Sequence, residues 1–69
     1  MDIVSKDSSI DELMLTVRSW SALMGEGIDT IGKLITYTER EIFRLPRIGR
    51  ESIKDINGAL SNIGLSLKK

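Results

Sequence analysis

The sequence predicts an all-α fold, a compact bundle of about four to five short helices. Three observations support this prediction. Apolar residues recur at intervals of three and four along most of the 69-residue chain. At two places Ser or Thr stands three residues before a glutamate, a pattern typical of helix starts. Glycines and the single proline separate several of the periodic segments, where helices end.

The first helical signals lie between residues 9 and 25. Ser9 and Glu12 predict a capping box, so we expect a short turn or helix whose apolar residues are Ile10, Leu13 and Leu15. A firmer helix is expected to open at Leu15 or Thr16 and to run to about Met24, before two glycines. Its predicted buried stripe consists of Val17, Trp20, Leu23 and Met24.

Two shorter helices are expected next. Asp29 or Thr30 is a natural N-cap for a helix that Tyr37 closes, and its inward positions are Ile31, Leu34 and Ile35. Thr38 and Glu41 predict a second capping box. The helix that this box starts ends at Pro46, and its inward positions are Ile42, Phe43 and Leu45.

The longest helix is predicted from about residue 50 to residue 63. It follows the stretch LPRIGRES (45–52), and Gly64 is a good residue to end it. Its apolar stripe consists of Ile53, Ile56, Leu60 and Ile63. A helix, a tight apolar-glycine turn and a second helix resemble a helix-hairpin-helix, which we expect at the centre of the bundle.

This turn admits two interpretations. The first amides of a helix have no intrahelical partners, and the helix dipole favours an anion there, so the turn is a candidate phosphate site. Gly49 would let phosphate oxygens approach the backbone, Ser52 would add a hydroxyl donor, and Arg50 would add a charge. The alternative is an ordinary reversal of direction with solvated arginines.

Composition excludes several classes of function. The chain has no cysteine and no histidine, which argues against disulfides, zinc-finger ligation and thiol or imidazole catalysis, so we predict no metal, no cofactor and no enzyme. Ten basic residues balance ten acidic ones, yet residues 40–54 carry a net charge of plus three. No apolar run approaches the roughly 20 residues of a membrane span, and a cytoplasmic location is expected.

The stretch from Ile10 to Leu67 resembles the C-terminal domain of the bacterial RNA polymerase alpha subunit. The segments that carry the resemblance are IDELMLTVRSWSAL (10–23), GIDTIGKLI (27–35), TERE (38–41), LPRIGRESIKDI (45–56) and NIGLSL (62–67). They follow the family's order and spacing without a gap. The resemblance implies a domain at residues 10–69 behind a flexible tail or linker remnant at 1–9, monomeric when isolated, in a nucleoid-associated polymerase.

The resemblance also implies a DNA-binding surface that reads A/T-rich upstream promoter DNA through the minor groove. The implied contacts are Arg18, Ser21, Arg47, Gly49, Arg50 and Ser52. Three departures from the family pattern occur here, at Ser21 and Ala22, at Glu51 and at Trp20. Ser21 and Ala22 replace a usual asparagine-cysteine pair, and Glu51 replaces a common lysine, so a carboxylate would face phosphate. Trp20 is interpreted as core, with base stacking as the alternative.

Contacts with activators and the sigma factor are implied as well, besides those with the remaining polymerase subunits. The implied protein contacts are Glu12, Thr38, Glu39, Arg40 and Glu41. Thr38, Glu41 and Glu12 also have the simpler role of helix capping. The alternative function is a protein-interaction module of the same fold that binds DNA weakly or not at all, which the zero net charge and Glu51 favour.

Overall fold

Five helical elements follow one another in the computed structural model, which describes residues 7–69. They are the 3-10 turn η1 (Ile10–Glu12), α1 (Val17–Gly25), α2 (Ile31–Leu34), α3 (Glu39–Phe43) and α4 (Arg50–Asn62). Residues 7–69 contain no strand, only two isolated backbone bridges. The predicted all-α bundle of short helices is therefore confirmed. Of the tail predicted at residues 1–9, residues 1–6 lie outside the described residues.

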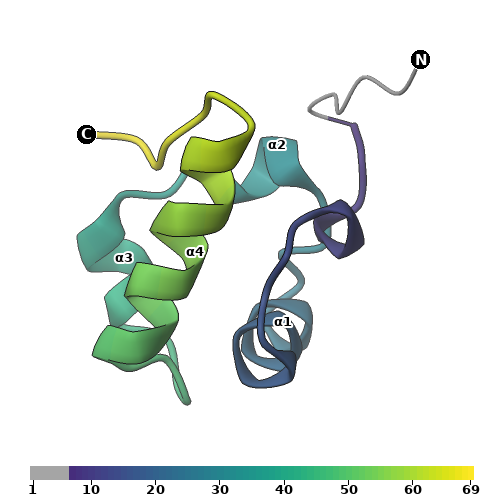
Figure 1. The fold of residues 1–69 in the computed structure, drawn as a ribbon. Helices are drawn as coiled ribbons and strands as arrows, with labels where there is room; N and C mark the ends of the chain where they lie inside the picture. Colours follow the sequence, from purple (N-terminus) through teal and green to yellow (C-terminus); the bar gives the residue numbers. More distant parts are fainter. Residues whose placement is uncertain (1–6) are drawn as a thin grey trace.

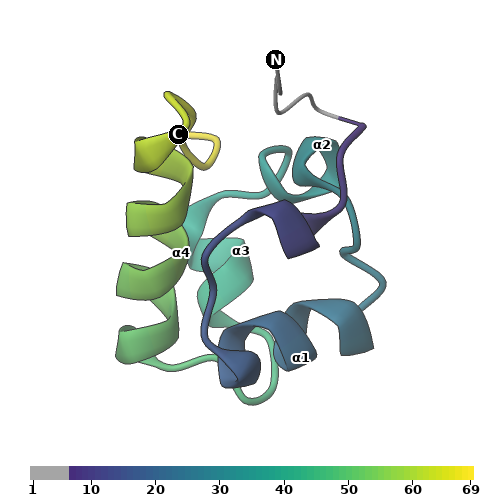
Figure 2. The same ribbon diagram turned by 45° about the vertical axis from the view of Figure 1, so that its right-hand side comes forward.

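Helix α4 is the central element. It stands between α3 and α1 (Figure 1), and in the turned view α1 lies across the base of the molecule, near the first turn of α4 (Figure 2). Ile56 and Leu60 of α4 are completely buried, as predicted. They belong to one core, whose other fully buried apolar side chains are Ile10, Leu23, Ile28, Ile31, Leu34 and Ile42.

Threonine side chains begin three of the four α-helices. Thr16, Thr30 and Thr38 accept hydrogen bonds from the amides of Ser19, Lys33 and Glu41, respectively. The predicted capping box of α3 is complete, because the Glu41 carboxylate also accepts from the Thr38 amide at 2.8 Å. Ser9 caps η1 differently from the prediction. Its hydroxyl accepts from the Asp11 amide at 3.1 Å, while the Glu12 amide donates to the Ser9 carbonyl oxygen.

The predicted buried stripe of α1 is wrong except for Leu23. Val17 is 79% exposed, Met24 39% and Trp20 36%, whereas Ser19 and Ala22 are buried beside Leu23. Ser19 can be buried because its hydroxyl accepts a hydrogen bond from Thr16 Oγ1 at 3.0 Å. The helix is therefore rotated so that Ser19 and Ala22 face the core beside Leu23, in place of the larger predicted residues.

Phe43 corrects a further prediction of burial, and a hydrogen bond accounts for the position of Trp20. The indole Nε1 of Trp20 donates to Asp11 Oδ1, so the ring reaches from α1 to η1 and is not a member of the core. Phe43 is half exposed because Ile42, next to it on the short helix α3, takes the buried position. Successive helix residues point about 100° apart, and on α3 Ile42 faces the core while Phe43 lies at its edge.

The ends of the described residues are tied to the helices. Near the N-terminus the amide of Ile31 donates to the Ser8 carbonyl oxygen at 2.9 Å, and that of Ile10 donates to the Asp29 carbonyl oxygen at 3.0 Å. At the other end the Lys68 amide donates to the Tyr37 carbonyl oxygen at 3.0 Å, just before α3. Lys33 Nζ of α2 lies 3.0 Å from Asp29 Oδ1. The hydrogen bond and the positive charge of Lys33 lower the pKa of the exposed Asp29 carboxyl below its ordinary value of 3.8.

Candidate nucleic-acid interface

A surface hollow joins the start of α1 to the first turns of α4. It has a volume of about 510 Å³, and we call it the Arg18 hollow. Its lining residues are Thr16, Arg18, Glu51, Ser52, Lys54 and Asp55. Two of the predicted DNA contacts, Arg18 and Ser52, thus meet in one depression although they stand far apart in the sequence.

A tertiary hydrogen bond positions Arg18 relative to α4. The Thr16 amide donates to Asp55 Oδ2 at 2.7 Å, which attaches the residue before α1 to the second turn of α4. Thr16 also caps α1 through the Ser19 amide at 3.2 Å. Arg18 follows two residues later and is exposed. Its guanidinium is therefore carried by a helix whose start is anchored to the other wall of the hollow.

The N-terminus of α4 is open to solvent. Gly49 precedes the helix with extended backbone angles, φ −120° and ψ −171°, and the helix start has no hydrogen bond from a capping side group. A Cβ placed on Gly49 would meet no atom within 4 Å, so an anion can approach from this side. The amides of the first turn have no intrahelical acceptors, and the helix dipole gives this end a partial positive charge. These features suit a phosphate group.

The turn before α4 depends on Arg47 rather than on Gly49 for its unusual backbone. Arg47 has φ +68°, in the left-handed region that residues with a Cβ seldom adopt. Its Nη2 lies 3.6 Å from the point that a Cβ on Gly25 would occupy, at the last residue of α1. A cation at a helix C-terminus is favourable, which gives Arg47 a role in the fold. Arg47 does not line the Arg18 hollow.

The remaining predicted DNA contacts take different positions. Ser52 is only 4% exposed, so most of its side chain is covered even though it lines the hollow. Ser21 is half-buried on α1. Arg50 is exposed but lines a second depression, the α3–α4 groove, whose other lining residues are Glu39, Arg40, Phe43, Ile53, Lys54 and Asn57.

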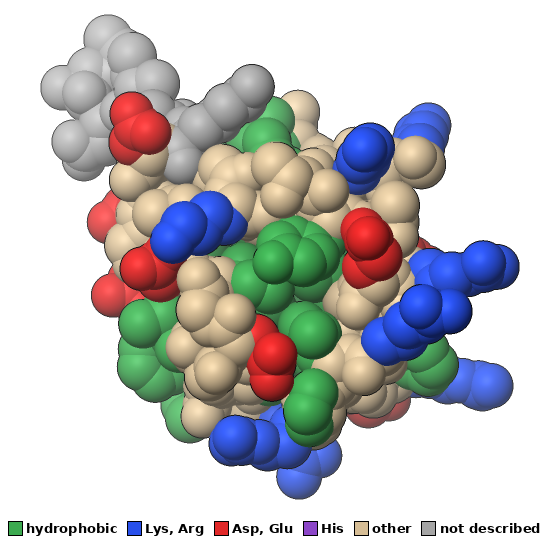
Figure 3. Space-filling view, turned by 180° about the vertical axis from the view of Figure 1, so that it is seen from behind, with side chains coloured by type: hydrophobic (Ala, Val, Ile, Leu, Met, Phe, Trp, Pro, Cys, Tyr) green, Lys and Arg blue, Asp and Glu red, His purple; other side chains and the backbone are tan. Residues whose placement is uncertain are grey.

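Acidic groups balance the basic ones inside the Arg18 hollow. Glu51 and Asp55 line it together with Arg18 and Lys54. Asp55 is engaged by the Thr16 amide, and Glu51 stands at the second position of α4. Seen from behind, basic side chains gather more densely on the side of the molecule where α3 lies (Figure 3). The uneven charge predicted from residues 40–54 thus extends beyond the hollow.

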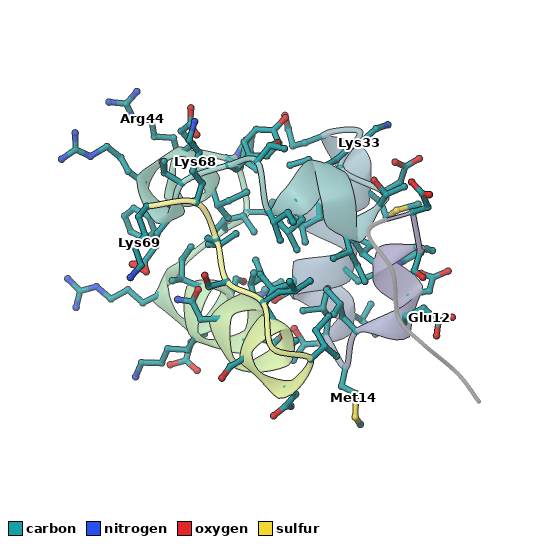
Figure 4. All side chains as sticks on the ribbon, turned by 90° about the horizontal axis from the view of Figure 1, so that it is seen from above. Glu12, Met14, Lys33, Arg44, Lys68 and Lys69 are labelled. Atoms are coloured by element: carbon teal, nitrogen blue, oxygen red, sulfur yellow. The ribbon has the colours of Figure 1, made fainter. Side chains whose placement is uncertain are left out.

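The predicted protein contacts are divided among three settings. Thr38 and Glu41 are engaged with each other in the capping box, and Glu39 accepts from Asn57 Nδ2 of α4 at 3.2 Å. Arg40 is exposed and lines the α3–α4 groove. Glu12 is exposed on η1, on the opposite side from Arg44, Lys68 and Lys69 in the view from above (Figure 4).

Three residues of the Arg18 hollow are not predicted as members of a site from the sequence. Thr16 is predicted only as a possible helix start, Lys54 only as part of the basic segment 40–54, and Asp55 has no predicted place in a site. The sequence spacing could have placed Asp55 in the site, because Asp55 stands four residues after Glu51 and therefore lies on the same face of α4. Nothing in the sequence pairs Asp55 with Thr16, which lies 39 residues away.

Residues 4–62 match the family of the C-terminal domain of the bacterial RNA polymerase alpha subunit. The chain belongs to this family. Curated relatives named "DNA-directed RNA polymerase subunit alpha" include one from Rubrobacter xylanophilus, 38% identical over 66 residues, and one from Bifidobacterium longum, 42% identical over 59 residues. A third, from Cutibacterium acnes, is 38% identical over 64 residues. The resemblance inferred from the sequence is confirmed.

These alignments cover most of this chain but little of the relatives. They span 96%, 86% and 93% of the 69 residues, and 21%, 18% and 19% of the Rubrobacter, Bifidobacterium and Cutibacterium proteins, respectively. The chain thus spans about a fifth of the curated relatives it matches. Membership of the alpha C-terminal domain family agrees with the prediction of a non-catalytic domain.

Two structural findings bear on further classes of function. Within residues 7–69, no group of three or more carboxylate, imidazole or thiolate side chains is arranged to hold a metal ion. Every helix in the same described range is too short or too polar to cross a lipid bilayer.

Proposed function

We propose that this chain is the DNA-binding and regulator-contacting domain of an RNA polymerase alpha subunit. In this role it binds A/T-rich upstream promoter DNA through the minor groove, within a nucleoid-associated polymerase in the cytoplasm. The observation that carries the proposal is the Arg18 hollow, in which an exposed arginine lies beside the uncapped N-terminus of α4. Membership of the alpha C-terminal domain family supports it.

The chemistry of the hollow fits the minor groove of A/T-rich DNA. Such DNA has a narrow groove whose enhanced negative potential attracts an inserted arginine side chain. Arg18 would enter the groove, and the amides after Gly49 would hold a phosphate of the adjoining backbone. Arginine would then sense groove shape, while the amides set the position of the domain along the duplex.

The test is a titration of the isotope-labelled chain with an A/T-rich duplex at two salt concentrations. We expect amide signals of Arg18, Gly49 and the first turn of α4 to shift, with weaker binding at higher salt. Arg18→Ala should abolish the shifts and leave the melting temperature almost unchanged, because the residue is exposed. Arg44→Ala is the matched control, since Arg44 is exposed and does not line the hollow.

Three results would contradict DNA binding at this site. The first is an unchanged spectrum at low salt. The second is a loss of binding by Arg18→Ala that comes with an equal loss of thermal stability, because Arg18 would then be a structural residue. Binding that Arg44→Ala weakens as strongly as Arg18→Ala would also contradict it, since general charge would then explain the affinity.

Contacts with activators and with the sigma factor form the second part of the proposed function. Glu12 and Arg40 are the best candidates among the predicted residues, because Thr38, Glu39 and Glu41 already have partners within the chain. A protein-interaction module without DNA binding is the second candidate function. Glu51 and Asp55 favour it, since they cancel the charge of the hollow. A transcription factor that binds Arg18→Ala as well as the unchanged protein, together with an unchanged spectrum when the duplex is added, would support this alternative.

A further inference from the structure

The α3–α4 groove is a second surface depression, distinct from the Arg18 hollow. It has a volume of about 570 Å³, within the roughly 300–1,000 Å³ typical of ligand pockets. Phe43 of α3 and Ile53 of α4 supply its apolar lining. Phe43 is 50% exposed, and Ile53, at 9%, closes the edge of the core beneath. The groove thus offers an accessible aromatic surface that the fold itself leaves uncovered.

Basic side chains surround this apolar surface. Arg40 comes from α3, and Arg50 and Lys54 come from α4. Glu39 is the only acidic residue in the lining, and its Oε2 accepts a hydrogen bond from Asn57 Nδ2 at 3.2 Å. The Glu39 carboxylate is thereby directed toward Asn57. The groove consequently presents an excess of positive charge around an aromatic centre.

The surroundings of the groove strengthen the same charge. Arg44, Lys68 and Lys69 project from one side of the molecule, beyond the end of α3 and along the C-terminal segment (Figure 4). The backbone bridge between Thr38 and Lys68 holds the C-terminal segment beside the start of α3. A partner approaching this side therefore meets a positive field before it reaches Phe43, which speeds the association of an acidic molecule.

We propose that the α3–α4 groove binds an acidic peptide segment of another protein, with one aromatic or leucine side chain seated against Phe43 and Ile53. The carboxylates of the segment would pair with Arg40, Arg50 and Lys54. Interfaces of this kind take most of their affinity from a buried apolar anchor, while the surrounding charges select the partner and raise the association rate. A short amphipathic helix is a common form for such a segment.

Two features favour a peptide over DNA in this groove. A phosphate backbone gains little from an aromatic wall, whereas an apolar side chain of a peptide can pack against Phe43 and Ile53. The Arg18 hollow has the complementary character, since its lining contains no large apolar side chain. The proposal does not depend on DNA binding, because Arg18 takes no part in the groove. Lys54 alone lines both depressions.

The experiment uses the isotope-labelled chain and a synthetic helical peptide of about 12 residues, rich in glutamate, with one central phenylalanine. We expect saturable shifts of the amide signals of Phe43, Ile53 and Asn57. Phe43→Ala should lower the affinity for the peptide about tenfold, as expected for an anchor contact. Arg40→Ala should lower this affinity about twofold to fivefold, with the larger effect at low salt. Lys33→Ala is the matched control, since this exposed lysine lies on α2, outside the groove.

Altered peptides test the charge and the apolar anchor separately. A peptide with glutamine in place of every glutamate, or with alanine in place of phenylalanine, should bind at least about fivefold more weakly. Arg18→Ala should bind the acidic peptide normally while failing to bind DNA. Melting curves test whether Phe43→Ala is folded. If Phe43→Ala melts early, Arg40→Ala tests the groove independently.

Four outcomes would overturn the proposal. The first is the absence of saturable shifts, and the second is equal binding of the glutamine and glutamate peptides. The third is displacement of the peptide from Phe43 by an A/T-rich duplex, which would make the groove a DNA surface. The fourth is a shift of the Phe43 and Asn57 signals with protein concentration alone, which would make a second copy of the protein the occupant.

Discussion

Glu51 has two opposing effects at one position. At the second residue of α4 its negative charge is favourable to the helix dipole, with a typical value of about 0.3–1 kcal/mol for an exposed group. The same carboxylate lines the Arg18 hollow, where it would repel a phosphate held by the first amides of the helix. The Glu51 carboxylate therefore raises the stability of the helix and lowers the affinity for DNA.

Glu51→Lys should raise the affinity for an A/T-rich duplex and steepen its dependence on salt. Each additional phosphate contact changes the logarithmic salt slope by about 0.9, and the substitution adds a contact where there was repulsion. The melting temperature should fall slightly, because a cation opposes the dipole at this end of α4. Fluorescence anisotropy at several salt concentrations measures both affinity and slope.

Glu26→Lys is the matched control for this charge reversal, since Glu26 is an exposed acidic residue that does not line the hollow. It should change the affinity much less than Glu51→Lys. Equal effects of the two substitutions would mean that only net charge matters. The position of Glu51 in the Arg18 hollow would then have no specific role in DNA binding.

At the scale of elements, α1 determines where Arg18 stands. The helix is only nine residues long, and its start is attached to α4 by the bond from the Thr16 amide to Asp55 Oδ2. Short isolated helices are marginal in water, so tertiary attachments of this kind decide their placement. The acidic residue that lowers the positive charge of the hollow therefore also holds its arginine in position.

Two substitutions of Asp55 separate these roles. Asp55→Asn removes the charge and keeps an oxygen acceptor for the Thr16 amide, so DNA affinity should rise with little loss of stability. Asp55→Ala removes the acceptor, and we expect a loss of about 1–2 kcal/mol in the free energy of unfolding and lower DNA affinity. Chemical denaturation and DNA titration measure the two effects. If alanine raised affinity as much as asparagine, the bond would not position Arg18.

The helices themselves were largely predictable, since short-range rules govern their ends. Thr38 and Glu41 form the predicted capping box, and Gly64 has the positive φ of +76° expected after α4. The rotation of α1 was not predictable from spacing. Val17, Trp20 and Met24 recur at three and four residues, but so do Ser19, Ala22 and Leu23, and the Thr16 hydroxyl that satisfies Ser19 decides between them.

The candidate site was predictable only in its parts. The family resemblance and the turn chemistry point to Arg18 and Gly49. Neither indicates that Arg50 lines the α3–α4 groove rather than the Arg18 hollow, or that Arg47 carries the left-handed turn. These features follow from the packing of α1, α3 and α4 around one another, which involves residues far apart in the chain.

At the scale of the whole molecule, nearly all stability rests on one small core. A domain of this size buries only about 60% of the surface that its unfolded chain exposes, and its total stability is on the order of 5 kcal/mol. The fully buried apolar side chains come from η1, from all four α-helices and, for Ile28, from the loop between α1 and α2. Ile56 and Leu60 of α4 are central among them. Both surface depressions share α4 as a wall, so both depend on this core.

Leu60→Ala should therefore unfold much of the population, whereas Val17→Ala should not. Truncating a fully buried leucine costs about 2–5 kcal/mol, which approaches the whole stability of the domain. Val17 was predicted to be core but is 79% exposed, so its truncation should change the free energy of unfolding by less than about 0.5 kcal/mol. Circular dichroism melts compare the two variants directly. Similar losses would place Val17 in the core after all, and the rotation of α1 that presents Arg18 to the hollow would then be wrong.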